Sequence, residues 1–348
     1  MVEIIKSFQS HGATIFVFLS AAEDSEIAQE LKHLNIKFRL LPLVSKYTVY
    51  KHIWPKFWFF LSYRPDVFIA SGQYATFAGI PVAYFFRIKR RVYIRHHSNY
   101  HHEFDHKSGL AADKFMNHLA TKIVAVSEVV KNILVVKEGV PLEKIVLIHN
   151  GIHIDKFSNR EGSENDPRQH LAYNDGLRIG VISRLTMLKG VEYTAIAFKE
   201  FLNFEPSATL SIIGEFSDSY DKICEILKNV PQDSFSIISS HPDIPMFFRS
   251  LDVFVHVPIS AEIESFGLVY IEALASGVPC IFSISGVMNE LHEPENYCEI
   301  VPYQDSKSIL EALKKISSSS TIYPYPKEWI SLFSLKEVGN QYAKKLIK

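Results

Sequence analysis

The strongest constraint on this chain is a repeated alternation between short apolar runs and longer segments with helical spacing. Runs such as Ala13–Leu19 and Pro65–Ala70 have the length and the branched or aromatic content of buried strands. After one polar stretch, Asp155–Gly176, the same alternation restarts at Leu177. Alternating strands and helices form parallel sheets with helices on both faces, so the sequence predicts two doubly wound α/β domains.

The predicted elements fall into two sets, one on each side of the polar stretch. For the first set we predict strands over 13–19, 36–43, 65–70, 91–95, 122–126 and 145–149, and helices over 2–10, 25–34, 45–63, 75–87, 111–120 and 128–138. For the second set we predict strands over 177–183, 208–213, 235–238, 253–256 and 279–284, and helices over 191–203, 220–229, 244–250, 268–274, 306–317 and 336–347.

Domain boundaries follow from this division. We predict a first domain over residues 1–158, a polar linker over 159–176, and a second domain over 177–325. The last segment, 326–348, is predicted to contain a helix that crosses back to the first domain. Ligands of doubly wound sheets bind at the carboxyl ends of the strands, so the loops that follow the strands are where functional residues are expected.

Composition excludes several classes of protein. The net charge of −1 argues against nucleic acid as a partner. The three cysteines have no metal-ligand spacing, and so sparse a set is typical of the reducing cytoplasm. No apolar run is long enough to span a membrane, and the first residues lack the apolar region of a signal peptide. These features predict a cytoplasmic protein.

The segment Glu264–Glu290 shows the clearest chemical pattern. Two carboxylates, Glu264 and Glu272, flank Gly267 and an apolar run that can begin a helix. A helix N-terminus offers free backbone N–H groups and partial positive charge, which suit a phosphate, and carboxylates beside it suit sugar or ribose hydroxyls. The alternative is an ordinary strand-loop-helix unit whose glutamates are solvated or cap the helix.

Five segments together resemble one family. They are KIVAVSE at 122–128, IHNGIHIDKF at 148–157, ISRLTMLKG at 182–190, LSIIGE at 210–215 and ESFGLVYIEALASGVP at 264–279. The chain resembles the retaining, nucleotide-sugar-dependent glycosyltransferases of the GT-B class, in family 4, also called glycosyl transferases group 1. That resemblance implies two Rossmann-like domains that face each other across a cleft.

The resemblance implies a role for several residues of the second domain. Arg184 and Lys189 would bind the donor diphosphate, although a basic pair in a solvated loop is the alternative. Glu264 would reach hydroxyls of the transferred sugar, and Glu272 would reach those of the nucleotide ribose. Backbone N–H groups toward phosphate and sugar would come from Phe266, Gly267, Leu268 and Val269. Near Glu290, Ser285 stands where the family usually has the first of two glycines.

Two histidines of the first domain are further candidates. His96 and His97 follow a predicted strand, where the family often has a histidine that faces the donor sugar. Adjacent residues point to different sides, and we favour His96 over His97; a structural or solvated pair is the alternative. The nearby cluster His101–His106 has no metal-binding spacing and is interpreted as a loop on the acceptor side. The resemblance implies no metal and no cofactor, since the nucleotide sugar is a substrate.

The beginning of the chain departs from the family pattern. Family members begin with a strand and a glycine-rich loop, whereas this chain begins within the match to the first helix. The first strand of a doubly wound sheet is central, so its loss predicts a gap in the sheet or a repacked domain. We therefore expect that the chain begins inside a longer reading frame, or that it is a degraded variant.

A membrane surface is a further expected partner. Residues 50–65 combine Trp54, Trp58 and three phenylalanines with basic residues, and RIKRR at 87–91 adds positive charge. This composition, together with the family's frequent use of lipid-linked acceptors, predicts peripheral contact with the inner face of the plasma membrane. The alternative is a helix that packs into the core beside an exposed basic loop.

The resulting hypothesis is a retaining, metal-independent glycosyltransferase. It would move a sugar from a UDP- or GDP-linked donor to a glycan or lipid-linked acceptor in cell-surface polysaccharide synthesis. Nucleotide-sugar 2-epimerases share the architecture but lack this Arg-x4-Lys and Glu-x7-Glu combination. The remaining alternative is an N-terminally truncated, non-catalytic protein that binds sugar nucleotides.

Overall fold

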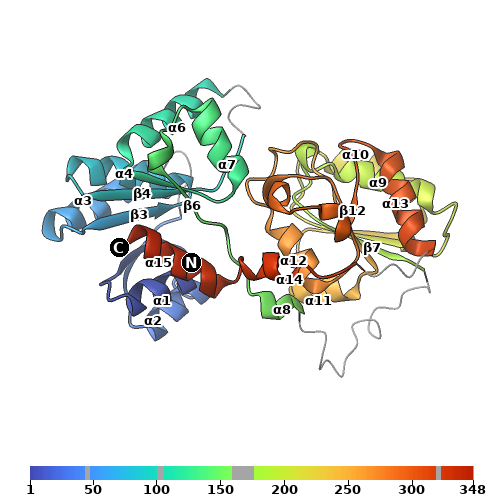
Figure 1. Cartoon of the computed structure of the whole chain (residues 1–348), viewed down its shortest axis with the longest axis horizontal. Helices are drawn as coiled ribbons and strands as arrows, with labels where there is room; N and C mark the ends of the chain where they lie inside the picture. Colours follow the sequence, from blue (N-terminus) through green and yellow to red (C-terminus); the bar gives the residue numbers. More distant parts are fainter. Residues whose placement is uncertain (44–47, 100–105, 159–175, 319–322, 348) are drawn as a thin grey trace. The chain divides into compact units, whose positions relative to one another are not determined.

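The structure is a computed structural model that describes residues 1–43, 48–99, 106–158, 176–318 and 323–347 (Figure 1). The chain divides into two compact units. The first contains Met1–Gly151 and Leu335–Lys348, and the second contains Ile152–Ser334. The sequence analysis placed these boundaries at 158 and 326, and most of its predicted linker lies outside the described residues.

The first unit contains two parallel sheets. One has four strands in the order β3-β4-β5-β6, and the other pairs β1 with β2. Their bounds are β1 (Phe16–Ser20), β2 (Lys37–Leu41), β3 (Val67–Ser71), β4 (Arg90–Arg95), β5 (Lys122–Ala125) and β6 (Ile145–Leu147). Among the described residues β1 pairs with β2 alone and β3 with β4 alone. The gap in the first sheet that the sequence predicts is therefore present.

Seven α-helices of the described chain accompany these sheets. They are α1 (Val2–Ser10), α2 (Glu26–His33), α3 (Ile53–Ser62), α4 (Gln73–Phe85), α6 (Lys107–Leu119), α7 (Glu128–Asn132) and α15 (Leu335–Leu346). Helix α7 continues directly into a π-helical turn over Ile133–Lys137. The aromatic rings of α3 contact both sheets. The ring centre of Phe59 lies 4.4 Å from that of Phe16 in β1, and the ring centre of Phe60 lies 5.4 Å from that of Phe68 in β3.

The C-terminal helix α15 belongs to the first unit. It packs so closely on α1 that a Cβ atom on Gly339 would lie 3.0 Å from the Glu3 carbonyl oxygen. The Lys345 ammonium donates to the carbonyl oxygen of Leu147, at the end of β6. Arg90, at the start of β4, donates to the carbonyl oxygen of Leu346. The last residues thus join a helix and two strands that lie far earlier in the sequence.

The second unit is a single six-stranded parallel sheet in the order β12-β11-β10-β7-β8-β9. Its strands are β7 (Arg178–Ile182), β8 (Thr209–Ile213), β9 (Phe235–Ile238), β10 (Val253–His256), β11 (Cys280–Phe282) and β12 (Glu299–Ile300). Its α-helices are α8 (Ile154–Ser158), α9 (Val191–Phe201), α10 (Tyr220–Leu227), α11 (Ile244–Ser250), α12 (Leu268–Ser276), α13 (Ser306–Ser318) and α14 (Lys327–Ser331). The expected doubly wound α/β fold is confirmed.

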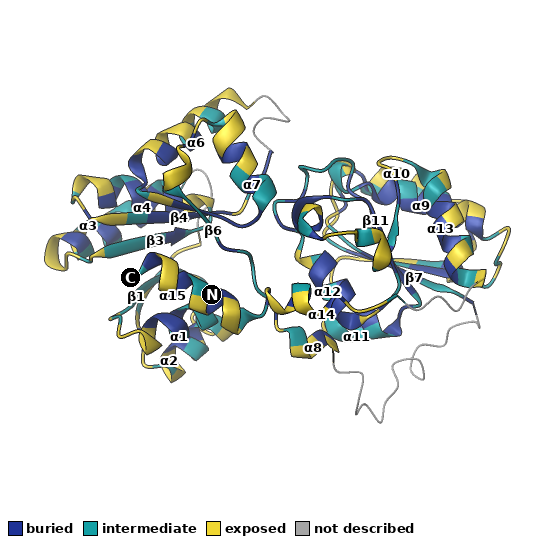
Figure 2. Cartoon of the chain, viewed as in Figure 1, coloured by how far each residue is buried: buried dark blue, intermediate teal, exposed yellow. Residues whose placement is uncertain are grey.

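The strand order defines where a ligand can bind in the second unit. The chain leaves β7 toward β8 on one side, and β10 pairs with β7 on the other side. Because the loops after β7 and β10 diverge at their carboxyl ends, they leave a crevice at this topological switch point. In Figure 2 the buried residues follow the helix faces that turn toward the sheets, and the opposite faces are exposed.

Candidate functional site

The loops after β7 and β10 are tied together at the switch point. The Ile259 backbone N–H donates to the Leu188 carbonyl oxygen over 3.1 Å. Gly190, at a φ of +67°, permits this approach, because a Cβ atom there would lie 2.1 Å from the Val257 carbonyl oxygen. The loops therefore bring the residues before α9 and those before α12 to one place.

Three side chains meet at this place. The Lys189 ammonium lies 2.5 Å from Oε1 of Glu264, and the His256 Nε2 atom lies 2.9 Å from the same oxygen. The side chain of Glu264 is 11% exposed and that of His256 only 2%. Two of these residues were predicted site residues, whereas His256, the last residue of β10, was not. We call Lys189, Glu264 and His256 the carboxylate cluster.

Electrostatics defines the protonation states of Glu264 and His256 in the carboxylate cluster. Burial alone would raise the pKa of Glu264, but the hydrogen bond from His256 and the charge of Lys189 outweigh it and lower that pKa to about 2. Burial lowers the pKa of His256. At neutral pH, then, Glu264 is an anion, and His256 is a neutral ring that donates its Nε2–H to it. The buried Nδ1 atom of His256 has no partner among the described residues.

Ser285 accounts for the departure from the family's glycine turn. Its hydroxyl accepts a hydrogen bond from the Glu264 backbone N–H at 3.0 Å and donates to the Ala261 carbonyl oxygen at 3.1 Å. A glycine could make neither bond. Ser285 therefore holds the loop that presents Glu264, and Glu290 ends the 3-10 turn that follows it.

The N-terminus of α12 lies directly after this loop. Gly267 caps the helix at a φ of +82°, and Leu268 and Val269 occupy its first turn, where backbone N–H groups lack helical acceptors. The Phe266 side chain is buried and contacts the ring of Phe333 at 5.6 Å. Phe266 thus anchors the loop in the core, while the residues after it present donors.

The other two predicted residues of this unit stand apart from the carboxylate cluster. Glu272 is half-buried on α12, and burial raises its pKa to about 7. Arg184 is exposed just beyond β7, and within the described part of the chain its guanidinium forms no ion pair. Of the two, Arg184 is the side chain that the solvent reaches freely.

The first unit contains a cavity of about 170 Å³. It lies at the carboxyl ends of β3 and β4, beside the first turn of α4. Both predicted histidines line it. The exposed His96 places Nε2 3.1 Å from the Ser71 hydroxyl, whereas the half-buried His97 places Nε2 3.2 Å from a carboxylate oxygen of Asp113.

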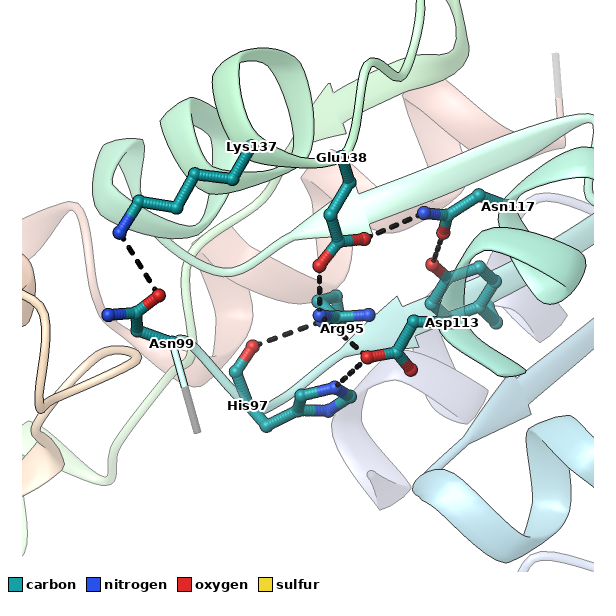
Figure 3. A network of polar contacts seen from close by, with 8 residues as sticks. Arg95, His97, Asn99, Asp113, Asn117, Lys137 and Glu138 are labelled. Carbon is teal, nitrogen blue, oxygen red and sulfur yellow. Dashed lines mark hydrogen bonds and ion pairs between the residues drawn. The ribbon is translucent and has the colours of Figure 1, made fainter. Parts of the chain in front are cut away.

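A buried polar network continues from His97 (Figure 3). Arg95 lies 3.2 Å from Asp113 and 2.5 Å from Glu138, and its Nε–H donates to the His97 carbonyl oxygen. Arg95, Asp113 and Glu138 were not predicted from the sequence. The one signal for Arg95 was a charged residue directly after the apolar run Val92–Ile94, and nothing local marked the two acids.

The expected acceptor-side loop at 101–106 lies, except for its last residue, outside the described residues. Within the ranges that the structure covers, no group of three or more histidine, cysteine or acidic residues could hold a metal ion. Likewise, none of the helices in those ranges is both long and apolar enough to cross a membrane.

Two family models match the chain in succession. The model for Glycosyltransferase Family 4 matches residues 1–156, and the model for Glycosyl transferases group 1 matches residues 162–331. Such a pair of matches on two Rossmann-like units defines a glycosyltransferase of the GT-B class. The chain belongs to family 4 of these glycosyltransferases, as its sequence motifs suggest.

Curated relatives match about half of the chain at low identity. The alpha-monoglucosyldiacylglycerol synthase of Streptococcus pneumoniae is 29% identical over 181 residues, which are 50% of this chain and 40% of that protein. The mannosylfructose-phosphate synthase of Agrobacterium fabrum is 25% identical over 195 residues, 53% of this chain and 42% of that protein. The chain thus spans about half the length of the curated relatives it matches, or less.

Solved structures share the whole fold. HepE of Anabaena, in complex with UDP-glucose, superposes with a TM-score of 0.79 at 20% identity and covers 99% of this chain and 94% of its own. WaaG, a glycosyltransferase involved in lipopolysaccharide biosynthesis, gives a TM-score of 0.68 at 13% identity, with 99% and 90% covered. At these identities the likeness establishes the shared fold.

Proposed function

We propose that the protein transfers a sugar from a nucleotide-diphosphate sugar to an acceptor hydroxyl. The observation that carries this proposal is the carboxylate cluster beside the N-terminus of α12. There a fixed anion, Glu264, a cation, Lys189, and free backbone N–H groups converge at the switch point of a doubly wound sheet. A sugar diphosphate needs hydroxyl acceptors and phosphate donors side by side, and this arrangement offers both.

Each residue then has a chemical task. Arg184 and Lys189 would neutralise the charge that develops on the leaving diphosphate, aided by the backbone N–H groups of Leu268 and Val269. Glu264 would accept hydrogen bonds from sugar hydroxyls, and Glu272 from the ribose. Transfer would retain the anomeric configuration, with attack on the face that the diphosphate leaves. The protein would act chiefly by positioning the reactants and stabilising charge.

The similar proteins indicate which nucleotide the donor contains and which class of molecule accepts the sugar. The UDP-glucose complex of HepE favours a UDP-sugar, and a GDP-sugar is the second donor to test. The pneumococcal relative is named for a glucosyl lipid, and WaaG is described as part of lipopolysaccharide synthesis. These relatives support a glycan or a lipid-linked molecule as acceptor, in the synthesis of cell-surface polysaccharide.

Calorimetric titration with UDP and GDP tests the donor site. Arg184→Ala and Glu272→Ala remove groups that are exposed or half-buried, so the fold should persist while nucleotide affinity falls by about tenfold or more. Lys228→Ala, which removes an exposed lysine at the end of α10, is the matched control and should bind as wild type does. Unchanged affinity in both site variants would remove the assignment.

Donor turnover separates an enzyme from a binding protein. If the chain is catalytic, purified protein should release nucleoside diphosphate from the preferred donor, slowly with water and faster with acceptor. Glu264→Gln should abolish release while nucleotide binding is retained. Binding without any release, in wild type and with a range of acceptors, would instead support the non-catalytic alternative.

Peripheral membrane contact is a second proposed property, and α3 supports it. This helix has two faces: Phe59 and Phe60 pack toward the sheets, while Trp54, Trp58 and Leu61 are 60%, 59% and 53% exposed. These three residues recur at helical spacing and so form one stripe. The expected core packing and the expected exposed face thus both occur, on opposite sides of one helix.

The end of α4 extends this exposed face. Phe85 is 70% exposed and its ring lies 6.0 Å from that of Phe57 on α3. Exposed basic residues stand near both helix ends in the sequence, namely Lys51, Arg64, Arg87 and Lys89. Exposed tryptophan and phenylalanine among basic residues suit the interface of an anionic bilayer.

Liposome flotation tests this surface. We expect the protein to float with vesicles that contain phosphatidylglycerol and less with vesicles of phosphatidylcholine alone. A Trp54→Ser/Trp58→Ser double variant should remain with the soluble fraction. Phe115→Ser, which removes a 54% exposed ring from α6, is the control and should float. Flotation of the double variant at the wild-type level would contradict a role for this face.

A further inference from the structure

The most unusual group of side chains outside the carboxylate cluster is the buried network of the first unit (Figure 3). It begins at Tyr93, whose hydroxyl bonds to Asn117, and Asn117 donates to Glu138 at 2.7 Å. Glu138 pairs with Arg95, and Arg95 pairs with Asp113. The side chains of Arg95, Asp113 and Glu138 are 2%, 5% and 1% exposed.

Such a network is not explained by stability. Withdrawing one guanidinium and two carboxylates from water is costly, and apolar side chains of the same volume would hold these elements together as well or better. The charges also come from three separate elements: Arg95 ends β4, Asp113 lies within α6, and Glu138 follows the π-helical turn. A π-helical turn is rare and occurs frequently at functional sites.

Three members of the network line the cavity, namely Tyr93, Arg95 and Asp113, and of these Asp113 bonds to a histidine ring there. Asp113 lines the cavity and accepts a hydrogen bond from Nε2 of His97, which also lines it. The backbone of His97 is held as well, because its carbonyl oxygen accepts from Nε of Arg95. His96 has instead the rotatable hydroxyl of Ser71 as partner and is exposed. The ring and backbone of His97 are thus held by charged partners, whereas the ring of His96 bonds to a hydroxyl that can rotate.

We propose that Asp113 is a positioning residue that fixes the ring of His97 at the cavity, and that Arg95, which also pairs with Glu138, holds Asp113 in place. The inference rests on the proposed function, since it takes the histidine at the end of β4 to face the sugar substrate. It assigns that task to His97. An anion that accepts from Nε2 selects the tautomer with the proton on that nitrogen and holds the ring plane.

Ring nitrogen NMR tests the positioning without any need for activity. In protein labelled with ¹⁵N-histidine, and with the His97 signals assigned through His97→Gln, the neutral ring should carry its proton on Nε2. Asp113→Ala should turn this into a mixture of tautomers. Asp113→Leu, which fills the site but cannot accept a hydrogen bond, gives the same test if the alanine variant fails to fold. A wild-type ring protonated on Nδ1, or a tautomer unaffected by both variants, would overturn the proposal.

A double-mutant cycle tests whether the positioning serves transfer. Asp113→Ala should lower kcat by about tenfold to a hundredfold with little change in the donor KM, as misplacement of a reacting group does. In a His97→Gln background the same substitution should change kcat less than about twofold. Glu128→Gln, which removes a carboxylate that pairs with Lys131 on the neighbouring α7, is the control and should keep the wild-type kcat.

The two tests fail in different ways. If Asp113→Ala lowers kcat equally with and without His97, Asp113 acts otherwise than through His97 and the positioning is refuted. The wild-type protein could also transfer no sugar while His97 keeps its Nε2–H tautomer only when Asp113 is present. In that case the proposed function is wrong, but Asp113 still positions the ring of His97.

Discussion

Glu264 and Glu272 are the same residue type eight positions apart, yet their surroundings shift their pKa values in opposite directions. Glu264 has a histidine and a lysine as partners, and its pKa falls to about 2. Glu272 is desolvated by α12 and its surroundings, and its pKa rises to about 7. Burial alone raises the pKa of either carboxyl, because it penalises the ionised form. The direction of the pKa shift is therefore decided by whether a hydrogen-bond donor or a cation lies beside the carboxyl.

Nucleotide affinity should therefore depend on pH through Glu272. The group is largely neutral below its raised pKa and ionised above it, and an ionised carboxylate is the better acceptor for ribose hydroxyls. We expect the Kd for UDP to fall about threefold to tenfold as the pH rises from about 6 to about 8. Titration of Glu272→Gln should show a flat profile. An equal slope in both proteins would place the titrating group elsewhere.

The free energy of unfolding should fall in acid because Glu264 becomes protonated. A carboxyl whose pKa is lower in the folded state contributes stability that is complete above its ordinary value of 4.5 and disappears as the pH falls through about 2. Glu264→Gln should thus unfold more easily than wild type at neutral pH, and the difference should shrink steadily below pH 4.5. Urea unfolding across this range measures it. A difference that stays constant with pH would mean that folding does not lower the pKa of Glu264.

At the residue scale, sequence spacing found those groups that stand at predictable points of the fold. Lys189 and Glu264 follow predicted strands, and the family resemblance assigned both to the donor site; the structure has them in contact. His256, and the bond that Ser285 makes to Glu264, were missed because these contacts with Glu264 span 8 and 21 positions of sequence. Nothing local distinguishes a histidine that ends a strand from any other buried histidine.

Among the elements, α12 depends most on its first residue. Gly267 has a φ of +82°, and a Cβ atom there would lie 2.6 Å from the Tyr270 ring. Tyr270 cannot yield easily, because it is fully buried and its hydroxyl donates to the Ser283 carbonyl oxygen at 2.7 Å. The helix N-terminus therefore tolerates no side chain at this position.

Gly267→Ala should lower the free energy of unfolding by about 2–4 kcal/mol, from backbone strain and overpacking together. Gly12→Ala is the matched control, because Gly12 has a φ of +80° but open space around its Cβ position. That variant should lose about 1–2 kcal/mol from strain alone. Equal losses in chemical denaturation would show that the contact with Tyr270 costs nothing.

Most elements could be predicted from the sequence, including the four-residue strands β9 and β10, and the elements that were missed are among the shortest. Helices α1, α9 and α13 match their predicted ranges closely, because several turns of periodic apolar residues mark them. The two-residue strand β12 and the five-residue helix α8 went unpredicted. Elements this short contain less than two periods of any pattern, so only their tertiary contacts define them.

On the scale of the whole molecule, the chain returns to its first unit at the end. Val338, Tyr342, Ala343 and Leu346 of α15 are all buried there. Burial of such side chains contributes about 1.5–3 kcal/mol for each large one, so the last helix supplies an appreciable part of the stability of a unit whose other residues end at Gly151.

Deletion of residues 335–348 should therefore remove the cooperative unfolding transition of the first unit and leave that of the second. Differential scanning calorimetry should show one transition fewer, or one shifted to much lower temperature. Lys336→Ala, at an exposed position of the same helix, is the control and should leave both transitions in place. Two unchanged transitions after the deletion would mean that the first unit folds without α15.

The separation of β1–β2 from the four-stranded sheet also bears on how the protein behaves in solution. On one side of β1 and on one side of β3, backbone N–H and C=O groups have no ladder partner among the described residues, and β1 consists of Phe16, Val17, Phe18, Leu19 and Ser20, without a charge. Uncharged apolar edges of this kind recruit strands from neighbouring molecules. Light scattering on a dilution series should show particles that grow with protein concentration well below the unfolding temperature. The protein concentration, more than the temperature, would then limit how long a preparation remains monodisperse.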